Sequence, residues 1–217
     1  MNCQLCHTPN AASLKVTKKP EHNYFHCAEC DLIFMEPTER LAPQFEKARY
    51  DQHENEDQAG HRAFLRPLLN EVEAFVQAEK MNLAELRLLD FGSGPSAALG
   101  KMFQEKNFNV TNYDLYYHPD QDALKRPYNI VTSTEVWEHL YNPREDIERM
   151  VRLTKKGGLL AVMTSGHKGG GVFADWYYRR DEAHVAFYSE KTMNWIARKF
   201  ELKLIKAQSP YWLFKRI

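Results

Sequence analysis

Four cysteines near the start of the chain have the spacing of a metal site. They form two pairs, Cys3-x-x-Cys6 and Cys27-x-x-Cys30. Each pair makes a tight turn that directs two thiolates at one ion, and four sulfurs complete a tetrahedral shell. Because nothing in the sequence suggests secretion, disulfides are the less favoured pairing. We therefore predict a structural Zn²⁺ site with no ligand position left open for catalysis.

A glycine turn marks a second place where chemistry is expected. The stretch LLDFGSGPSAALG contains Asp90, Gly92 and Gly94 between a strand-like run and a small-residue run that looks helical. Glycines let the chain turn tightly and let a ligand approach the main chain, and the start of the helix offers N–H groups without helical partners. This pattern favours a nucleotide-like ligand.

Two pairs of polar residues are candidates for acid–base chemistry. His184 follows Asp181 by three residues, so the carboxylate could orient the imidazole and leave one nitrogen as a base. The alternative is a histidine that ties its loop to the body of the protein. Glu135 and His139 have the i, i+4 spacing of one helical face opening toward the ligand. On it, Glu135 is the catalytic candidate near the ligand, and His139 would mainly pack in the structure.

The segment 166–188 is long for a connection and rich in aromatic residues, which is typical of a lid or binding wall. Within it, Tyr177, Tyr178 and Arg179 could hold a polar or anionic substrate. An equally open interpretation is that Arg179 and Arg180 only pair with acidic residues on the surface.

Composition limits the function classes. The chain has 217 residues, 43% of them hydrophobic, and equal numbers (29 each) of basic and acidic residues. This balance gives no general attraction to nucleic acid or membranes, so we expect no membrane partner and consider a nucleic-acid partner unfavoured. The apolar runs are too short for a membrane helix, and the N-terminal residues lack a signal-peptide pattern. We expect a cytoplasmic protein.

The elements that must position these residues alternate between strand and helix. We expect strands at 86–91, 108–115, 128–136 and 159–165, helices at 61–80, 97–106, 142–156 and 191–200, and a closing hairpin at 201–207 and 211–217. The predicted fold class is α/β: a Rossmann-like, doubly wound, mostly parallel sheet with a C-terminal antiparallel strand, preceded by a small zinc ribbon. In such sheets, ligands bind at the carboxyl ends of the strands. Gly92, Gly94, Asp114, Thr134 and Glu135 all fall at such ends.

The expected organisation has three parts: a zinc ribbon at 1–36, a linker with an amphipathic helix at 37–80, and a cofactor-binding domain at 81–217. The linker is polar and charged up to residue 60. In the helix that follows, Pro67 is expected near the first turn or at a kink.

From Leu86 onward, the chain resembles the class I S-adenosylmethionine-dependent methyltransferases. The resemblance consists of DFGSG at 90–94, an acid at Asp114, YNIV at 128–131, EVWEHL at 135–140 and KKGG at 155–158. With the ribbon in front, the chain is similar to a bacterial subgroup that has an N-terminal zinc-binding module. Some relatives with that architecture methylate carbon atoms of deoxysugars.

The resemblance implies S-adenosyl-L-methionine as cofactor. Asp114 would accept hydrogen bonds from the ribose diol, and the methionine tail would lie near Asp90, Gly92 and Gly94, with Thr134 and Glu135 at the next strand end. The alternative cofactor is a dinucleotide. Its binding motif has a glycine turn followed by an acid about 20 residues later, and Asp114 lies 20 residues after Gly94. A carboxylate beside the glycine turn would repel a pyrophosphate, which favours the sulfonium cofactor.

Two features depart from the family pattern. Pro95-Ser96 replaces the usual third glycine, and only 13 residues separate Asp114 from Tyr128. A short loop must therefore replace the usual helix, strand and helix, and the adenine-side acid, Asp120 or Asp122, is not assigned.

The predicted function is methyl transfer to a small-molecule acceptor, such as a sugar or nucleotide sugar. One alternative is an RNA base methyltransferase, supported by seven basic residues and one acidic residue at 191–217. Another is a non-enzymatic cofactor-binding or assembly module. The acceptor atom and the oligomeric state stay open.

Overall fold

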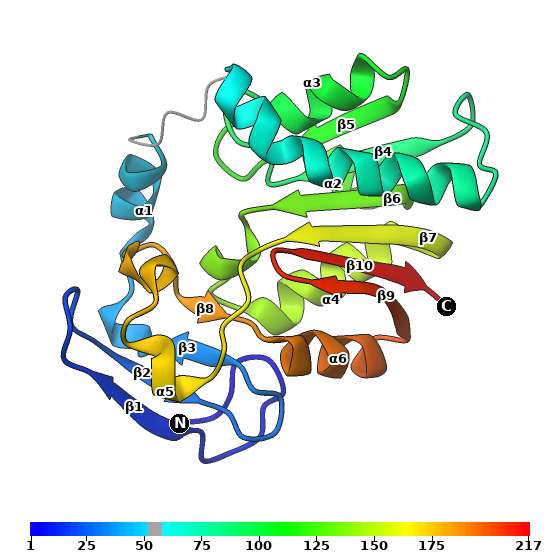
Figure 1. The fold of residues 1–217 in the computed structure, drawn as a ribbon. Helices are drawn as coiled ribbons and strands as arrows, with labels where there is room; N and C mark the ends of the chain where they lie inside the picture. The colour runs from blue at the N-terminus through cyan, green and yellow to red at the C-terminus, as the bar shows by residue number, and fades with distance from the viewer. Residues whose placement is uncertain (52–57) are drawn as a thin grey trace.

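A six-stranded sheet lies at the centre of the computed structural model, which describes residues 1–51 and 58–217 (Figure 1). Its strands run in the order β5-β4-β6-β7-β10-β9. They are β4 (Arg87–Phe91), β5 (Asn109–Tyr113), β6 (Tyr128–Thr134), β7 (Thr154–Met163), β9 (Leu202–Gln208) and β10 (Tyr211–Arg216). Strands β5, β4, β6 and β7 are parallel, while β10 is antiparallel to both β7 and β9. The predicted mostly parallel sheet with a closing antiparallel strand is confirmed.

Helices cover both faces of this sheet (Figure 1). One face carries α2 (Ala59–Ala78) and α3 (Ala98–Gln104), and the other carries α4 (Pro143–Leu153) and α6 (Glu190–Lys199). Successive strand residues point to opposite faces. Accordingly, Leu88 packs in the cluster under α2 and α3, whereas Leu89 packs in the cluster with α4 and α6. Burial on both faces explains why these strands read as continuous apolar runs.

The amphipathic helix in front of the sheet forms as α2. Its buried residues are Leu65, Leu68, Leu69, Val72, Phe75 and Val76, at the spacing of one helical face. Phe64, expected on the same stripe, is exposed instead. The helix begins at Ala59, so Pro67 lies inside it and not in its first turn. In the part of the chain that the structure describes, no helix is both long enough and apolar enough to cross a membrane.

The N-terminal module is a second, smaller sheet. Strands β1 (Ala12–Val16), β2 (His22–His26) and β3 (Ile33–Met35) pair in antiparallel fashion. A fourth strand, β8 (Ala186–Phe187), comes from the other end of the chain and pairs with β3 through Ile33↔Phe187 and Phe34↔Ala186. The sheet order is β1-β2-β3-β8. The segment after β7 therefore completes the sheet of the N-terminal module.

The long segment at 166–188 contains α5 (Gly170–Phe173), the 3₁₀ turn η4 (Tyr177–Arg180) and β8. Its apolar side chains form a third hydrophobic cluster with the N-terminal sheet, in which Phe173 and Phe187 pack around Tyr24. This shared core fixes the segment against the N-terminal module.

The connection after β5 is as short as predicted. It contains only the 3₁₀ turn η2 (Gln121–Lys125) before β6 begins at Tyr128, and β5 is an edge strand. Asp114 and His118 form an isolated bridge at its start. The carboxyl end of β5 is therefore closed by a tight loop.

The end of the predicted helix at 142–156, placed just before Gly157 and Gly158 as helix-ending residues, is wrong. α4 ends at Leu153, and β7 begins at Thr154 and runs through both glycines. The pairing of β6 with β7 shifts register between Tyr128 and Ile130, and Gly157 has φ +75°. The glycines thus form an irregularity inside a strand.

Candidate active site

The carboxyl ends of β4, β5 and β6 open on a cavity of about 890 Å³. Gly92 and Gly94 follow β4, Asp114 follows β5, and Thr134 ends β6. All of these residues line the cavity, as do Asp90, Glu135, His139 and His184. A separate, more open hollow lies between the β1–β2 hairpin and Phe45, away from the strand ends. Topology and enclosure therefore both point to the cavity at the strand ends.

The turn after β4 requires its glycines. Gly92 has φ +78° and Gly94 has φ +65°, a region that other residues rarely adopt. A Cβ on Gly92 would lie 2.2 Å from Cγ2 of Val136, while a Cβ on Gly94 would meet nothing within 4 Å. Gly92 thus allows close packing with Val136, and Gly94 leaves main chain open toward the cavity.

The carboxylate of Asp114 is held by three backbone N–H groups. Gly94 donates to Oδ2 at 3.0 Å, and Tyr116 and Tyr117 donate to Oδ1 at 2.9 and 3.0 Å. Because a carboxylate has about four acceptor positions, these bonds leave room for roughly one more. Asp114 therefore joins the glycine turn to the β5 loop in one fixed geometry.

Asp90 lies beneath the glycine turn and is 1% exposed. Its Oδ1 accepts a hydrogen bond from the hydroxyl of Thr132 on β6 at 2.8 Å. Burial raises the pKa of this carboxyl to about 6 because the charged form loses its water. Asp90 is thus a fixed polar group at the base of the cavity.

At the end of β6, two carboxylates meet one tyrosine. Glu135 has φ +50°, a strained conformation for a residue with a side chain, and its N–H donates to Met163 O on β7. The hydroxyl of Tyr178 lies 2.5 Å from Oε1 of Glu138 and 3.2 Å from Oε2 of Glu135. Thr164 donates to Oε2 of Glu138 at 2.9 Å. Burial and, second to it, the nearby negative charge of Glu138 raise the pKa of Glu135 to about 9.

Two imidazoles lie beside these carboxylates. The rings of His139 and His184 are 4.8 Å apart between centroids. Nδ1 of His139 lies 3.0 Å from Ala183 O, and Nδ1 of His184 lies 2.6 Å from Tyr178 O. Because a carbonyl only accepts, each Nδ1 carries the proton, and Nε2 is the basic nitrogen of each ring. Burial lowers the pKa of His139 to about 4, which favours the neutral ring.

Several predicted contacts differ in the structure. His184 has the Tyr178 carbonyl, not the Asp181 carboxylate, as its Nδ1 partner. Asp181 accepts from Arg49 and from Ala183 N. Glu135 and His139 do not share a helical face, because only a 3₁₀ turn, η3 (Trp137–His139), follows β6. Both residues nevertheless line the cavity.

The three predicted substrate residues have separate surroundings. Tyr178 contacts the two carboxylates, whereas Tyr177 is 66% exposed. Arg179 is 1% exposed and donates to the carbonyls of Ala174, Pro20, Lys18 and Lys19. The guanidinium therefore fastens the β1–β2 hairpin to η4 through backbone carbonyls.

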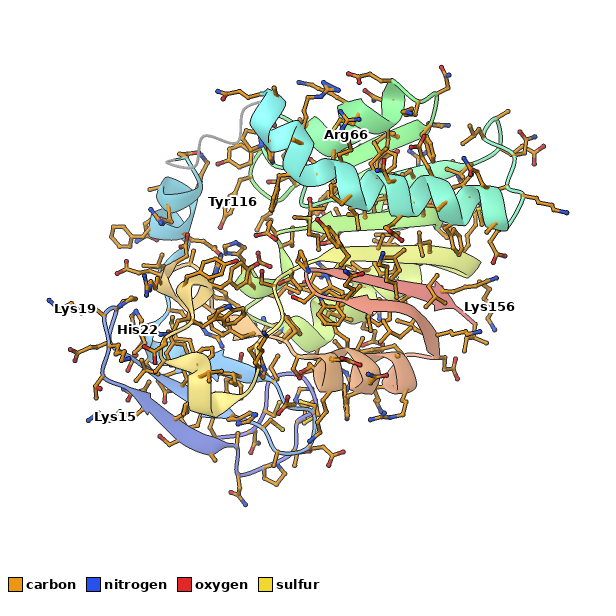
Figure 2. The ribbon with its side chains drawn as sticks, in the orientation of Figure 1. Lys15, Lys19, His22, Arg66, Tyr116 and Lys156 are labelled. Carbon is orange, nitrogen blue, oxygen red and sulfur yellow. The ribbon has the colours of Figure 1, made fainter. Side chains whose placement is uncertain are left out.

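Sequence reasoning missed part of the cavity wall. Helix α1 (Pro43–Tyr50) brings Glu46, whose Oε2 accepts from the Tyr116 hydroxyl at 2.8 Å. Figure 2 shows Tyr116 between α1 and α2, whereas Lys15, Lys19 and His22 lie on the N-terminal sheet. Glu138 and Thr164 were also missed; the spacing Glu135-x-x-Glu138-His139 is the one sequence signal that links Glu138 to the site.

The cysteines converge as a metal site requires. Sγ of Cys3 lies 3.5 Å from that of Cys30, and Sγ of Cys6 lies 3.4 Å from that of Cys27, with no disulfide among them. The four sulfurs all lie within 4.8 Å of one another. A tetrahedral zinc shell separates its sulfurs by about 3.8 Å. The four cysteines thus fit one Zn²⁺, and their geometry is consistent with the predicted ribbon.

Several solved structures are similar to this chain at low sequence identity. An O-methyltransferase family protein from Burkholderia thailandensis is 14% identical with a TM-score of 0.48, and the alignment covers 79% of this chain and 62% of that one. Magnesium protoporphyrin IX methyltransferase from Synechocystis PCC 6803, solved with bound S-adenosylmethionine, is 15% identical, with coverages of 71% and 78% and a TM-score of 0.47. The YcgJ protein from Bacillus subtilis is 18% identical, with coverages of 64% and 71% and a TM-score of 0.45.

The family assignment rests on a longer match. No curated protein matches this chain significantly. A family described as "Methyltransferase domain" matches residues 36–207, from the end of β3 to the end of β9. This match confirms the predicted class of enzyme, a methyltransferase. The chain belongs to the methyltransferase domain family.

Proposed function

We propose that the protein transfers a methyl group from S-adenosylmethionine to a small hydroxylated acceptor, such as a sugar or nucleotide sugar, bound in the cavity at the strand ends. One observation carries this proposal. The Asp114 carboxylate and the open main chain at Gly94 face the same cavity as the imidazoles of His139 and His184. A cofactor site and a polar acceptor site thus adjoin.

The cofactor would lie along the ends of β4, β5 and β6. With three N–H groups already on Asp114, its carboxylate has room for about one direct hydrogen bond to the ribose diol. The methionine end would extend past Gly92 toward Asp90, and Thr134 and Glu135 would border the sulfonium. Ser93 supports this placement, because its buried hydroxyl has no partner among the described residues.

The acceptor would lie in the cavity against His184, next to the buried Tyr178. When bound, S-adenosylmethionine would supply the methyl group to the acceptor oxygen, and the electron pair of the broken carbon–sulfur bond would remain on sulfur. The acceptor's proton passes to Nε2 of His184, because its Nδ1 is held by the Tyr178 carbonyl. Alignment of donor and acceptor with exclusion of water supplies the rest of the rate enhancement. Asp181 would act indirectly, since its backbone carbonyl accepts from the His184 N–H.

We further propose the organisation expected from the sequence: a zinc ribbon at 1–36, a connecting region at 37–80 and a catalytic domain at 81–217. The pairing of β3 with β8 supports a structural role for the Zn²⁺, because the ribbon stabilises the segment that presents Tyr178 and His184. Arg179 would act with the ribbon rather than on the substrate.

The test is calorimetry with S-adenosylhomocysteine on Asp114→Asn. The NH₂ group of the new amide would face one of the three backbone N–H donors, from which it cannot accept a hydrogen bond. The variant also loses the charge-assisted hydrogen bond between the carboxylate and the ribose diol, worth about 1.5 to 3 kcal/mol. We expect roughly 10- to 100-fold weaker binding. Asp175→Asn is the matched control, because Asp175 pairs with Lys18 on the surface, outside the cavity. Equal affinity in both variants, or preferential binding of a nicotinamide dinucleotide, would refute the proposal.

A second measurement identifies the acceptor class. Wild-type protein is incubated with methyl-labelled cofactor and either nucleotide sugars or RNA, over a range of salt concentrations. We expect turnover with the small molecules and little dependence on salt. Turnover confined to RNA with a steep loss at high salt would favour the nucleic-acid alternative, and tight cofactor binding with no turnover on any acceptor would favour an assembly module.

A further inference from the structure

A group of ligand-type side chains, apart from the cysteine cluster, joins two histidines that line the cavity, His139 and His184, to the buried Glu138. The donor atoms of Glu138, His139 and His184 all lie within 4.8 Å of one another. Donors bound to one divalent ion at about 2.1 Å are separated by roughly 3 to 4 Å. A small inward movement of side chains would therefore place all three on a single ion.

The surroundings of the two histidines match those of metal ligands. Each ring donates Nδ1–H to a backbone carbonyl, His139 to Ala183 and His184 to Tyr178. Histidines that bind metals usually donate their other ring N–H to a carbonyl or carboxylate, which fixes the tautomer and the orientation of the ring. Two neighbouring rings here share this arrangement, with Nε2 as the ligating nitrogen of both.

The carboxylate is oriented in the same way. Tyr178 donates to Oε1 of Glu138 and Thr164 donates to Oε2. Thr164 is itself held, because its carbonyl accepts from the indole N–H of Trp212 at 2.9 Å. Hydrogen bonds of this kind orient ligating carboxylates, and each oxygen retains a further lone pair for an ion.

A second carboxylate adjoins the group from the cavity side. Glu135 shares the Tyr178 hydroxyl with Glu138 and lines the cavity together with His139 and His184. Its left-handed backbone, φ +50°, is held by a hydrogen bond from its N–H to Met163 O. Strained residues of this kind gather at functional sites, and this one brings a second carboxylate, and so a fourth ligand atom, to the same place.

We infer that Glu138, His139 and His184, with Glu135 at the edge, bind a divalent transition-metal ion beside the cavity. Two imidazoles with carboxylates suit Zn²⁺, Mn²⁺, Fe²⁺ or Co²⁺ better than Mg²⁺ or Ca²⁺. In contrast to the four-cysteine site, this donor set leaves positions open toward the cavity.

The role of this ion rests on the proposed methyltransferase function. A bound divalent ion lowers the pKa of a hydroxyl that it coordinates, whose proton is then lost to solvent. In this arrangement His184 binds the ion and does not accept the proton of the acceptor hydroxyl. The ion then activates the acceptor oxygen in place of the imidazole. The acceptor class narrows to molecules with oxygen donors, such as a vicinal diol or a hydroxyl beside a carboxylate.

The test is titration of the full-length, zinc-loaded protein with Co²⁺, followed by visible absorption and by metal analysis after gel filtration. We expect one further ion per chain, with a spectrum of nitrogen and oxygen ligands and without thiolate charge-transfer bands. Glu138→Gln and His184→Gln should each weaken this binding about 100-fold or more. His22→Gln is the matched control, because His22 lies on β2 of the N-terminal sheet (Figure 2), pairs with Glu39 and does not line the cavity.

Binding of S-adenosylhomocysteine, measured on the same samples, separates the two proposals and reports that the variants are folded. If wild type binds S-adenosylhomocysteine but takes up no further ion, or if Glu138→Gln and His184→Gln bind Co²⁺ as wild type does, the metal site is refuted and the methyltransferase proposal stands. If Co²⁺ binds with the expected dependence on both residues and S-adenosylhomocysteine does not, the site is supported and its proposed role in methyl transfer fails.

Discussion

Because the carboxyl of Asp90 is buried, we expect its contribution to the unfolding free energy of the protein to fall as the pH rises. Burial raises its pKa from 3.8 to about 6 in the folded protein. Between these values the folded state retains a proton that the unfolded state has lost, so this carboxyl's contribution to stability is fully present below pH 3.8 and is lost as the pH rises through 6. The shift of about two pKa units corresponds to a loss of about 3 kcal/mol.

The matching variant is Asp90→Asn, which is of nearly equal size and does not titrate. The unfolding free energy of this variant should exceed that of wild type by about 1 kcal/mol at pH 4.5 and by about 3 kcal/mol at pH 7.5. The altered hydrogen bond with Thr132 adds a constant difference that does not depend on pH. For a chain of this size, the change of about 2 kcal/mol between these pH values corresponds to a difference of roughly 4 to 8 °C in melting temperature.

The assay is urea denaturation of both proteins at several pH values in the presence of excess Zn²⁺. Comparing the two proteins at each pH cancels titration elsewhere, including that of the cysteines. If their difference in unfolding free energy stays constant from pH 4.5 to 7.5, the raised pKa of Asp90 and the reasoning from its burial are refuted.

Two further predictions concern the turn and the ribbon. Gly92→Ala adds a Cβ 2.2 Å from Cγ2 of Val136 at φ +78°, so we expect a loss of about 1 to 3 kcal/mol in urea denaturation. Adding Val136→Ala to this variant should restore part of the lost unfolding free energy. A Gly92→Ala protein as stable as wild type would contradict the close packing of Gly92 against Val136. Removal of Zn²⁺ by a chelator, or Cys27→Ser, should speed hydrogen exchange in 22–35 and also in 184–188, because β3 and β8 pair. Unchanged exchange in 184–188, measured by mass spectrometry, would show that the pairing does not depend on the metal.

Much of the central fold could be predicted because its signals are local. A buried parallel strand is a short apolar run, and a glycine turn follows β4 directly in the sequence. The positions of Gly92, Gly94 and Asp114 at strand ends, and hence their convergence on one cavity, follow from the parallel arrangement alone. The spacing of the cysteines likewise predicted their convergence.

The remaining features depend on contacts between distant parts of the chain. The carbonyl of Tyr178 became the partner of His184 because η4 folds back over it, and spacing alone had suggested Asp181. The helix boundary at Gly157 was misplaced because glycine signals both a helix end and an irregular strand, and only pairing with β6 distinguishes them. Glu138 was overlooked because a buried carboxylate is identified by its partners, and these come from Thr164, just after β7, and from η4.

The hairpin contacts of Arg179 bear on how the chain can be divided. Three of the carbonyls that this buried guanidinium binds belong to Lys18, Lys19 and Pro20, and the partner of β8 is β3. A fragment that starts after residue 36 would retain an interior cation stripped of most of its acceptors and a two-residue strand with no neighbour to pair with. Anyone trimming or fusing this protein should therefore treat the first 36 residues as inseparable from the rest.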